Sequence, residues 1–153
     1  MHLEEIKRAL KSSHLFRDLH ESHLDLVLMV CEELNYQAGE VIFHQDDPGD
    51  ALYIIARGQV EIILESEQDK EAVELAVLEA HDTFGEAILI EKGLRSATAR
   101  CRTDIALVRL PRQRLIRLVD NYPEIGFYIM RRMAADLMEK LRAANLNIRR
   151  VTG

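Results

Sequence analysis

The sequence has little of several features that mark specialised proteins. Its two cysteines, Cys31 and Cys101, are too few for a disulfide framework, which favours a reducing, cytoplasmic setting. No apolar run approaches the roughly 20 residues of a membrane-spanning helix, and the charged pattern of residues 1–11 is unlike a secretory signal. Repeats and low-complexity tracts are absent as well. The remaining composition, 48% apolar and 30% charged over 153 residues, is that of one globular domain with its own core.

Basic side chains are outnumbered by acidic ones, 20 to 26, which weighs against a chain that coats nucleic acid or an anionic membrane. The two signs are unevenly placed, because residues 1–99 carry a net charge of −13 and residues 100–153 a net charge of +7. The basic C-terminal third fits a nucleic-acid face, a helical segment beside an acidic sheet, or a pocket for an anionic ligand. Charge alone leaves these alternatives open.

Apolar residues recur at helical spacing in the first third of the chain. Residues 3–10 predict one helix, which ends at the Ser12–Ser13 pair. A second helix is predicted from Ser22, a suitable N-cap, to Leu34.

From Asn35 to Leu110 the apolar period changes to two, which is typical of β-strands. Val60, Ile62 and Leu64, for example, share one face of a predicted strand. Turns rich in Gly, Pro and Asp separate about eight such short segments. Many short strands at this spacing predict a small barrel or jelly roll, so the fold is mainly β with flanking helices.

Two helices are predicted after the strands. Pro111 suits the first turn of a helix to about Asn121, and Pro123 opens a longer one to about Asn147. Apolar residues follow one line along the longer helix: Ile125, Ile129, Met133, Leu137, Leu141, Ala144 and Ile148. Such a stripe needs a partner surface along its length.

Residues 84–99, between two predicted strands, carry the chemistry. Gly85 allows a ligand to approach the backbone closely, and the N–H groups of the short helical turn after it form an anion site. The planar guanidinium of Arg95 suits a phosphate, and the carboxylate of Glu86 suits a sugar hydroxyl. Taken by themselves, these three residues also fit a surface salt bridge in a sheet loop.

The whole pattern resembles the cyclic nucleotide-binding domain family. That family includes the sensory domains of bacterial catabolite-activator-type regulators, the regulatory subunits of cyclic-AMP-dependent kinase and cyclic-nucleotide-gated channels. The resemblance covers nearly all of residues 14–147. Four blocks carry it: residues 38–43 with 47–55, residues 58–62, Phe84-Gly85-Glu86 with Arg95-Ser96-Ala97-Thr98-Ala99, and residues 103–111 with the two helices that follow.

The family resemblance implies an eight-stranded antiparallel β-roll, which is a jelly roll or double-stranded β-helix, with N-terminal helices and two C-terminal helices. One domain is expected, with a helical segment at residues 1–34 and the roll at residues 35–110. The phosphate-binding cassette would span residues 84–99 of the roll. Hinge and lid helices would occupy residues 111–153.

The resemblance also implies roles for individual residues. Arg95 would pair with the cyclic phosphate, Glu86 and Gly85 would bind the ribose 2′-hydroxyl, and the N–H groups near Ala87 and Ile88 would point at the phosphate. The other implied positions are Ser96 and Ala97 beside the phosphate and base, Ile62, Leu75 and Ala76 in the pocket wall, and Leu137, Lys140 and Leu141 in a lid from the last helix. The cassette offers neither a metal cluster nor an activated nucleophile, so no catalytic residue, metal or cofactor is expected.

Four positions depart from the family pattern. Ile88 stands where members usually carry a small residue, because the phosphate comes close there. If the Ile88 side chain points inward, the pocket is smaller and affinity falls; if it points away, only its N–H matters. Leu94 replaces the usual Pro before the Arg, and Asp46 and His81 replace Gly at two turns, which predicts a small strain cost there.

We therefore expect a cytoplasmic cyclic-nucleotide sensor domain that is not an enzyme and that repositions its C-terminal helices when ligand binds. Cyclic AMP is favoured over cyclic GMP as the ligand, because Ser96 stands in the region where members that prefer cyclic GMP often have Thr. The expected partners are the nucleotide and either a second copy, joined through the last helix, or an output protein.

Three alternatives stand beside this expectation. A metal-dependent, cupin-like enzyme is disfavoured because only His20 and His23 are close in sequence and no His-x-His lies on a strand. A DNA-binding regulator would need a helix-turn-helix, for which the six residues after the long helix leave no room, so no direct DNA binding is expected from this chain. The third alternative is an interaction module of the same fold with a silent pocket.

Overall fold

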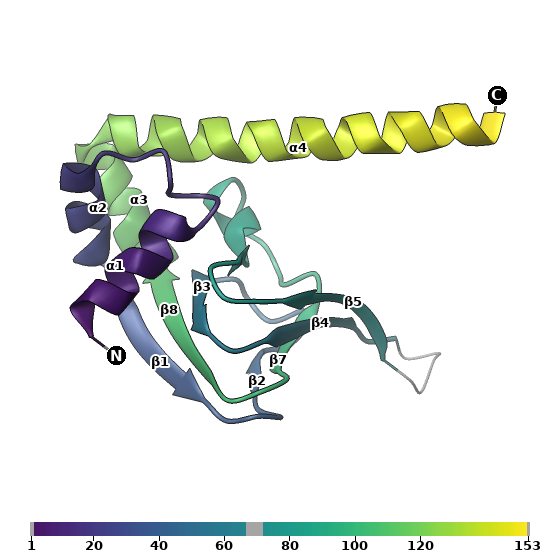
Figure 1. Ribbon diagram of the computed structural model, residues 1–153, viewed down its shortest axis with the longest axis horizontal. Helices are drawn as coiled ribbons and strands as arrows, with labels where there is room; N and C mark the ends of the chain where they lie inside the picture. Colours follow the sequence, from purple (N-terminus) through teal and green to yellow (C-terminus); the bar gives the residue numbers. More distant parts are fainter. Residues whose placement is uncertain (1, 67–71, 153) are drawn as a thin grey trace.

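Eight strands form two four-stranded antiparallel sheets in the part of the chain that the computed structural model describes, residues 2–66 and 72–152, with side chains described up to Leu146 (Figure 1). The first sheet has the order β1 (Glu32–Tyr36), β8 (Ile105–Pro111), β3 (Ala51–Arg57), β6 (Thr83–Phe84). The second has the order β2 (Val41–Phe43), β7 (Thr98–Cys101), β4 (Val60–Leu64), β5 (Val73–Leu78). This arrangement confirms the predicted β-roll. The alternation of Val73, Leu75 and Val77 also predicts a strand over residues 71–78, and residue 71 at its start lies outside the described residues.

Four α-helices and one 3₁₀ turn flank the sheets (Figure 1). They are α1 (Leu3–Ser12), α2 (Glu21–Leu28), η1 (Glu86–Leu89), α3 (Arg112–Asn121) and α4 (Pro123–Thr152). Side chains of all four α-helices pack in one core against the outer face of the first sheet. The helices therefore cover this sheet, and η1 is inserted between β6 and β7.

The central strand β3 is apolar on both faces because it separates two cores. Ala51, Tyr53 and Ile55 point into the interior of the roll, whereas Leu52 and Ile54 belong to the core beneath the helices. Strand β8 divides its residues in the same way. A strand buried on both faces reads as a continuous apolar run, which explains why Leu52 to Ile55 shows no polar alternation.

The second helix is shorter than predicted and begins one residue earlier. It runs from Glu21 to Leu28 with His20 at its N-cap position, whereas the sequence predicted a helix from Ser22 to Leu34. Residues 32–36 instead form β1 and pair with β8, and the residues of β1 alternate between half-buried and exposed. The backbone hydrogen bonds of this pairing outweigh the local helical pattern, because a strand beside β8 completes the first sheet.

Helix α4 begins at Pro123 as predicted and continues to Thr152, beyond the predicted end near Asn147. Its apolar line is divided: Ile125, Ile129 and Met133 are buried, whereas Leu137 and Leu141 are 58% and 61% exposed. Figure 1 shows the reason, since the C-terminal part of α4 runs past the roll. Among the described helices, none combines the length and the apolar character that crossing a bilayer requires.

Candidate functional site

The cassette turn begins at a glycine that no other residue could replace without strain. Gly85 has a φ of 75° and occupies the N-cap position of η1. A Cβ atom at Gly85 would lie 2.7 Å from Nη1 of Arg95, closer than real Cβ contacts. The left-handed backbone and the close guanidinium therefore both require glycine at this position.

Arg95 is buried, with 5% of its surface exposed, and its guanidinium is held mainly by neutral groups. Nη2 donates to the Ala51 carbonyl at 2.7 Å, and Nη1 donates to the Gly85 carbonyl at 3.3 Å. The guanidinium carbon lies 4.2 Å from the centroid of the Phe43 ring, a cation–π contact. The carboxylate of Asp50 is 3.6 Å away.

The charge of Arg95 is only partly balanced by these neighbours. Burial lowers the pKa of Arg95, which Tyr53 and Asp50 partly oppose. The Nε atom is buried and finds no hydrogen-bond acceptor among the described residues. A buried cation with a free donor favours binding of an anion, since an acceptor would complete its hydrogen bonding.

Ile88 points inward. Its side chain is 5% exposed and packs on Gly49, where an added Cβ would lie 2.4 Å from Ile88 Cγ2 and 3.6 Å from the guanidinium carbon of Arg95. Its carbonyl accepts a 2.7 Å hydrogen bond from Nε of Arg112 in α3. Ile88 therefore fills space beside the guanidinium and links the cassette to the C-terminal helices.

Three aromatic rings fill the roll beneath the guanidinium. The rings of Tyr53 and Phe84 stack with their centroids 5.2 Å apart, and the Phe43 centroid lies 5.8 Å from that of Tyr53 and 6.0 Å from that of Phe84. No pattern in the sequence places Phe43 beside Arg95, because β2 and the cassette meet only in the folded roll. The guanidinium therefore packs on this cluster, with Phe43 in direct contact.

A cavity of about 440 Å³ lies between η1 and α4. It brings together four of the predicted site residues, Glu86 and Ala87 from the cassette and Leu137 and Lys140 from the lid helix. The remaining lining residues, which sequence reasoning missed, are His14, Leu15, Leu78, Asp82, Thr83, Ile90, Met133 and Asp136. Its volume and mixed apolar and polar lining are typical of a small-molecule site.

The other predicted residues do not line this cavity. Arg95, Ile88 and Ala97 are buried, whereas Ser96 is exposed. Ile62 packs against the aromatic interior of the roll, and Leu75, Ala76 and Leu141 are exposed. The structure thus buries Arg95 and Ile88 of the predicted phosphate site, and it leaves every predicted wall and lid residue except Ile62 exposed.

Two of the family departures have the predicted backbone. Asp46 has a φ of 71° and His81 a φ of 75°, both in the left-handed region that glycine adopts without cost. The Asp46 N–H donates to the Arg95 carbonyl at 2.8 Å, so this turn supports the cassette. Leu94 is exposed and forms a β-bridge with Pro48.

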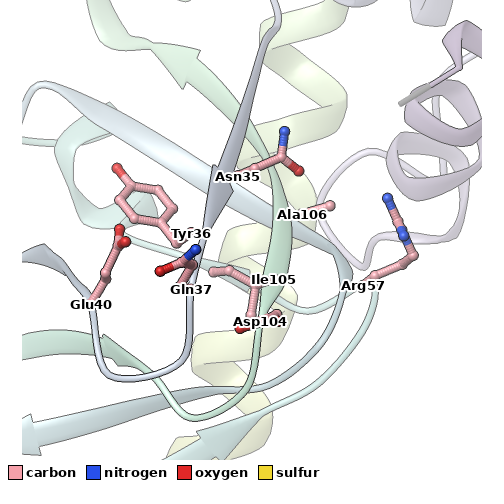
Figure 2. A pocket seen from close by; sticks show the side chains of 8 residues that line it. All are labelled: Asn35, Tyr36, Gln37, Glu40, Arg57, Asp104, Ile105 and Ala106. Atoms are coloured by element: carbon pink, nitrogen blue, oxygen red, sulfur yellow. The ribbon is translucent and has the colours of Figure 1, made fainter.

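A second cavity, of about 500 Å³, is lined by residues of β1, β3 and β8 and of the loops after β1 and before β8 (Figure 2). Figure 2 shows the side chains that line it, most of which are polar. Nε of Arg57, one of these residues, lies 2.7 Å from a carboxylate oxygen of Glu5 in α1. Burial raises the pKa of Tyr36, another of its lining residues. Its lining contains none of the residues that the cassette motif implied.

The histidines suggest no metal centre. The rings of His20 and His23 lie 6.0 Å apart and tilted. Among the described residues, no group of three or more His, Cys, Asp or Glu side chains is placed to hold a metal ion.

The residues of the cassette site can bind a small anion that also carries hydroxyl groups.

A β-roll with a buried arginine beside a short helical turn defines a domain that binds a small anionic ligand. The family model of the cyclic nucleotide-binding domain matches residues 33–122. The chain belongs to the cyclic nucleotide-binding domain family.

Three similar proteins illustrate the family. A cyclic AMP receptor protein of Thermus thermophilus is 34% identical over 139 residues, which cover 91% of this chain and 62% of the receptor. A cGMP-dependent protein kinase of Drosophila melanogaster is 32% identical over 118 residues, which cover 76% of this chain and 13% of the kinase. The regulatory domain of Toxoplasma gondii PKA, crystallised with cAMP, is similar with a TM-score of 0.70 and 28% identity over 78% of this chain and 45% of that chain.

The chain spans less than two thirds of the length of these proteins. Most of the kinase lies outside the matched region. What the similarity covers is therefore the regulatory, ligand-binding domain.

Proposed function

We propose that the chain is a regulatory domain that binds a cyclic nucleotide, preferably cyclic AMP, and that catalyses no reaction. The observation that carries the proposal is the buried Arg95 guanidinium, whose Nε has no acceptor among the described residues. A phosphate oxygen would accept from it in a charge-assisted hydrogen bond. The relatives named for cAMP support the choice of base.

In this proposal the phosphate lies against Arg95 and the N–H groups of Ala87 and Ile88, and the ribose hydroxyl meets Gly85 and Glu86. Since Glu86 lines the cavity between η1 and α4, the base extends into that cavity under Leu137 and Lys140. The remaining proposed contacts are Ser96 and Ala97 near the phosphate, Ile62, Leu75 and Ala76 as wall, and Leu141 as lid. The exposure of Leu75, Ala76 and Leu141 means that β5 and α4 must close on the ligand for these contacts to form.

Binding also requires Ile88 to move. Its side chain occupies space beside Arg95, so a phosphate there displaces η1. Because the Ile88 carbonyl is bonded to Arg112 of α3, this displacement reaches the hinge and α4. A ligand shifts this equilibrium only by its differential affinity for the two arrangements.

Calorimetric titration of the wild type and of Arg95→Ala with cyclic AMP and cyclic GMP tests the proposal. We expect the wild type to bind cyclic AMP more tightly, and Arg95→Ala to lose about 2–5 kcal/mol of binding free energy because the phosphate loses its charge partner. Circular dichroism controls for folding, since Arg95 also holds two carbonyls. Unchanged affinity in a folded Arg95→Ala protein would contradict the site, and absence of binding by the wild type would favour a silent pocket.

A homodimer through α4 is the second part of the proposal. Phe127, Met130, Leu137 and Leu141 are all exposed, and with Ala134 they alternate steps of three and four residues, the spacing of a coiled-coil seam. This outer stripe is distinct from the buried residues Ile125, Ile129 and Met133. An output protein that covers the same stripe is the alternative partner.

Sedimentation equilibrium of the wild type and of Leu141→Glu tests the dimer. A charge in the seam should convert the dimer to a monomer, whereas Glu139→Gln on another face of the helix should leave the mass unchanged. Equal masses for wild type and Leu141→Glu would count against a seam at this position.

Direct DNA binding is not part of the proposed function, which we place in the cytoplasm. Much of the basic charge of the C-terminal third is paired with acidic side chains elsewhere. The pairs are Arg100–Glu61, Arg102–Glu74, Arg109–Glu32, Arg109–Asp50, Arg114–Glu32 and Arg132–Asp18. A gel shift at physiological salt should show no specific complex.

A further inference from the structure

The segment between α1 and α2, residues 13–20, contacts α4 through the polar side chains of Asp18 and His14. Asp18 accepts hydrogen bonds from Nε of Arg132 at 3.2 Å and from Nη2 at 2.7 Å. One helical turn further along α4, Nε2 of His14 contacts a carboxylate oxygen of Asp136. Both acceptor–donor pairs therefore fix the same side of α4 to the N-terminal segment.

The His14–Asp136 contact is the most C-terminal polar contact between α4 and the other described residues. Apolar packing also ends nearby, because Met133 is buried and Leu137 is exposed. The last contacts that position the middle of α4 therefore lie at about residue 136.

Both partners line the cavity between η1 and α4, together with Glu86, Leu137 and Lys140. We infer that His14 and Asp136 are positioning residues of this cavity, which together hold Leu137 and Lys140 opposite Glu86 in a proton-dependent manner. The effect on nucleotide affinity rests on the proposed function, whereas the effect on α4 does not.

The sign of the pH dependence follows from the charges. An imidazole can change its charge near neutral pH, and only the protonated ring forms an ion pair with a carboxylate. The charged groups that face His14 across the cavity are Asp136 and Lys140 of α4, Glu86 of η1 and Asp82 before β6. Protonation of the ring therefore strengthens its contact with Asp136, whereas an uncharged ring holds Asp136 only by a hydrogen bond from a neutral N–H group. Both side chains are partly exposed, so solvent screening limits the effect to about threefold in affinity.

Hydrogen exchange on the unliganded full chain tests the positioning. At about pH 5.5, amides of residues 134–140 should exchange more slowly in the wild type than in His14→Ala or Asp136→Asn, and at about pH 8 this difference should be smaller. His2→Ala and Glu139→Gln are matched controls, since each removes one histidine or one α4 carboxylate outside the cavity lining, and both should behave as the wild type. His14→Lys keeps a cation at both pH values and should retain protection at the higher pH.

Calorimetry with cyclic AMP tests the consequence for the site. The wild type should bind about threefold more tightly at the lower pH, and His14→Ala and Asp136→Asn should lose this dependence. Identical pH profiles and identical exchange in wild type and His14→Ala would overturn the inference while leaving nucleotide binding intact. If the wild type binds neither cyclic AMP nor cyclic GMP, the proposed function fails, and the exchange experiment alone decides whether His14 and Asp136 position α4.

Discussion

Arg95 and Ile88 lie buried inside the roll, whereas Lys140 and Leu137 lie exposed beside a cavity between η1 and α4. We refer to Gly49, Gly85, Ile88 and Arg95 as the closed half of the site. His14, Glu86, Asp136 and Lys140 form the open half. The closed half is made by the loop before β3 and by the cassette, and the open half by three segments that are distant in sequence.

The difference between the halves lies in what holds each residue in place. In the closed half, backbone carbonyls hold the guanidinium and the core holds Ile88, so a substitution there alters folding stability together with binding. In the open half, side chains meet across solvent, where ion pairs contribute little to stability. Ligand preference and regulation can therefore change in the open half at small cost to the fold.

Ile88→Ala should separate stability from binding most strongly. Loss of the buried side chain should lower the free energy of unfolding by about 2–4 kcal/mol, whereas cyclic AMP affinity should rise about fivefold to tenfold because η1 no longer has to move. Urea unfolding and calorimetry measure the two effects. Ile90→Ala, which removes an isoleucine that is 60% exposed, should leave unfolding nearly unchanged. Weaker binding by Ile88→Ala would show that Ile88 supports the ligand and does not obstruct it.

Gly49→Ala should destabilise the closed half by overpacking. The new methyl group would lie 2.4 Å from Ile88 Cγ2, which should cost about 1–3 kcal/mol in urea unfolding. The double variant Gly49→Ala/Ile88→Ala should recover part of this loss, since the cavity left by Ile88 accepts the methyl group. Gly93→Ala is the matched control, because a Cβ there meets nothing within 4 Å. Additive losses in the double variant would contradict the contact.

The closed half could largely be predicted from the sequence because its signals are local. Gly85, Ile88 and Arg95 lie within ten residues of one another, and the left-handed Asp46 and His81 follow from turn positions where glycine is usual. The alternation of the strands also predicted the roll. A local pattern cannot show which strand pairs with which. The prediction of a helix as far as Leu34 was therefore wrong, because residues 32–36 form β1 and pair with β8.

The open half could be predicted only in part, because its residues come together through tertiary packing. His14 and Asp136 are separated by 122 positions, and neither belongs to a motif. Phe43 likewise meets Arg95 only because β2 and the cassette adjoin in the roll. A periodic stripe predicted that α4 needs a partner surface, but it could not assign the buried part to the core and the exposed part to the cavity and solvent.

Arg112→Gln should weaken the link between the closed half and the hinge. The Ile88 carbonyl loses its 2.7 Å hydrogen bond from Nε, which should lower unfolding stability by about 1 kcal/mol. Hydrogen exchange of α3 and α4 should then respond less to cyclic AMP than in the wild type. Arg117→Gln, at an exposed arginine of the same helix, should change neither quantity. An unaltered ligand response in Arg112→Gln would place the link elsewhere.

Lys140→Gln should have the smallest effect and be confined to the open half. Lys140 lines the cavity with Glu86, so its ammonium should attract an anionic ligand without supporting the fold. We expect cyclic AMP affinity to fall about twofold to threefold at low ionic strength. The loss should disappear at about 0.5 M salt, where the screening length is only a few ångströms. Arg142→Gln removes a charge two residues further along α4 and outside the cavity lining, and it should leave affinity unchanged. If both variants lose affinity equally, the charge of the whole helix attracts the ligand and Lys140 has no particular place in the lid. If only Lys140→Gln loses affinity, the ligand lies in the cavity close to Lys140, because a screened charge acts only over short distances.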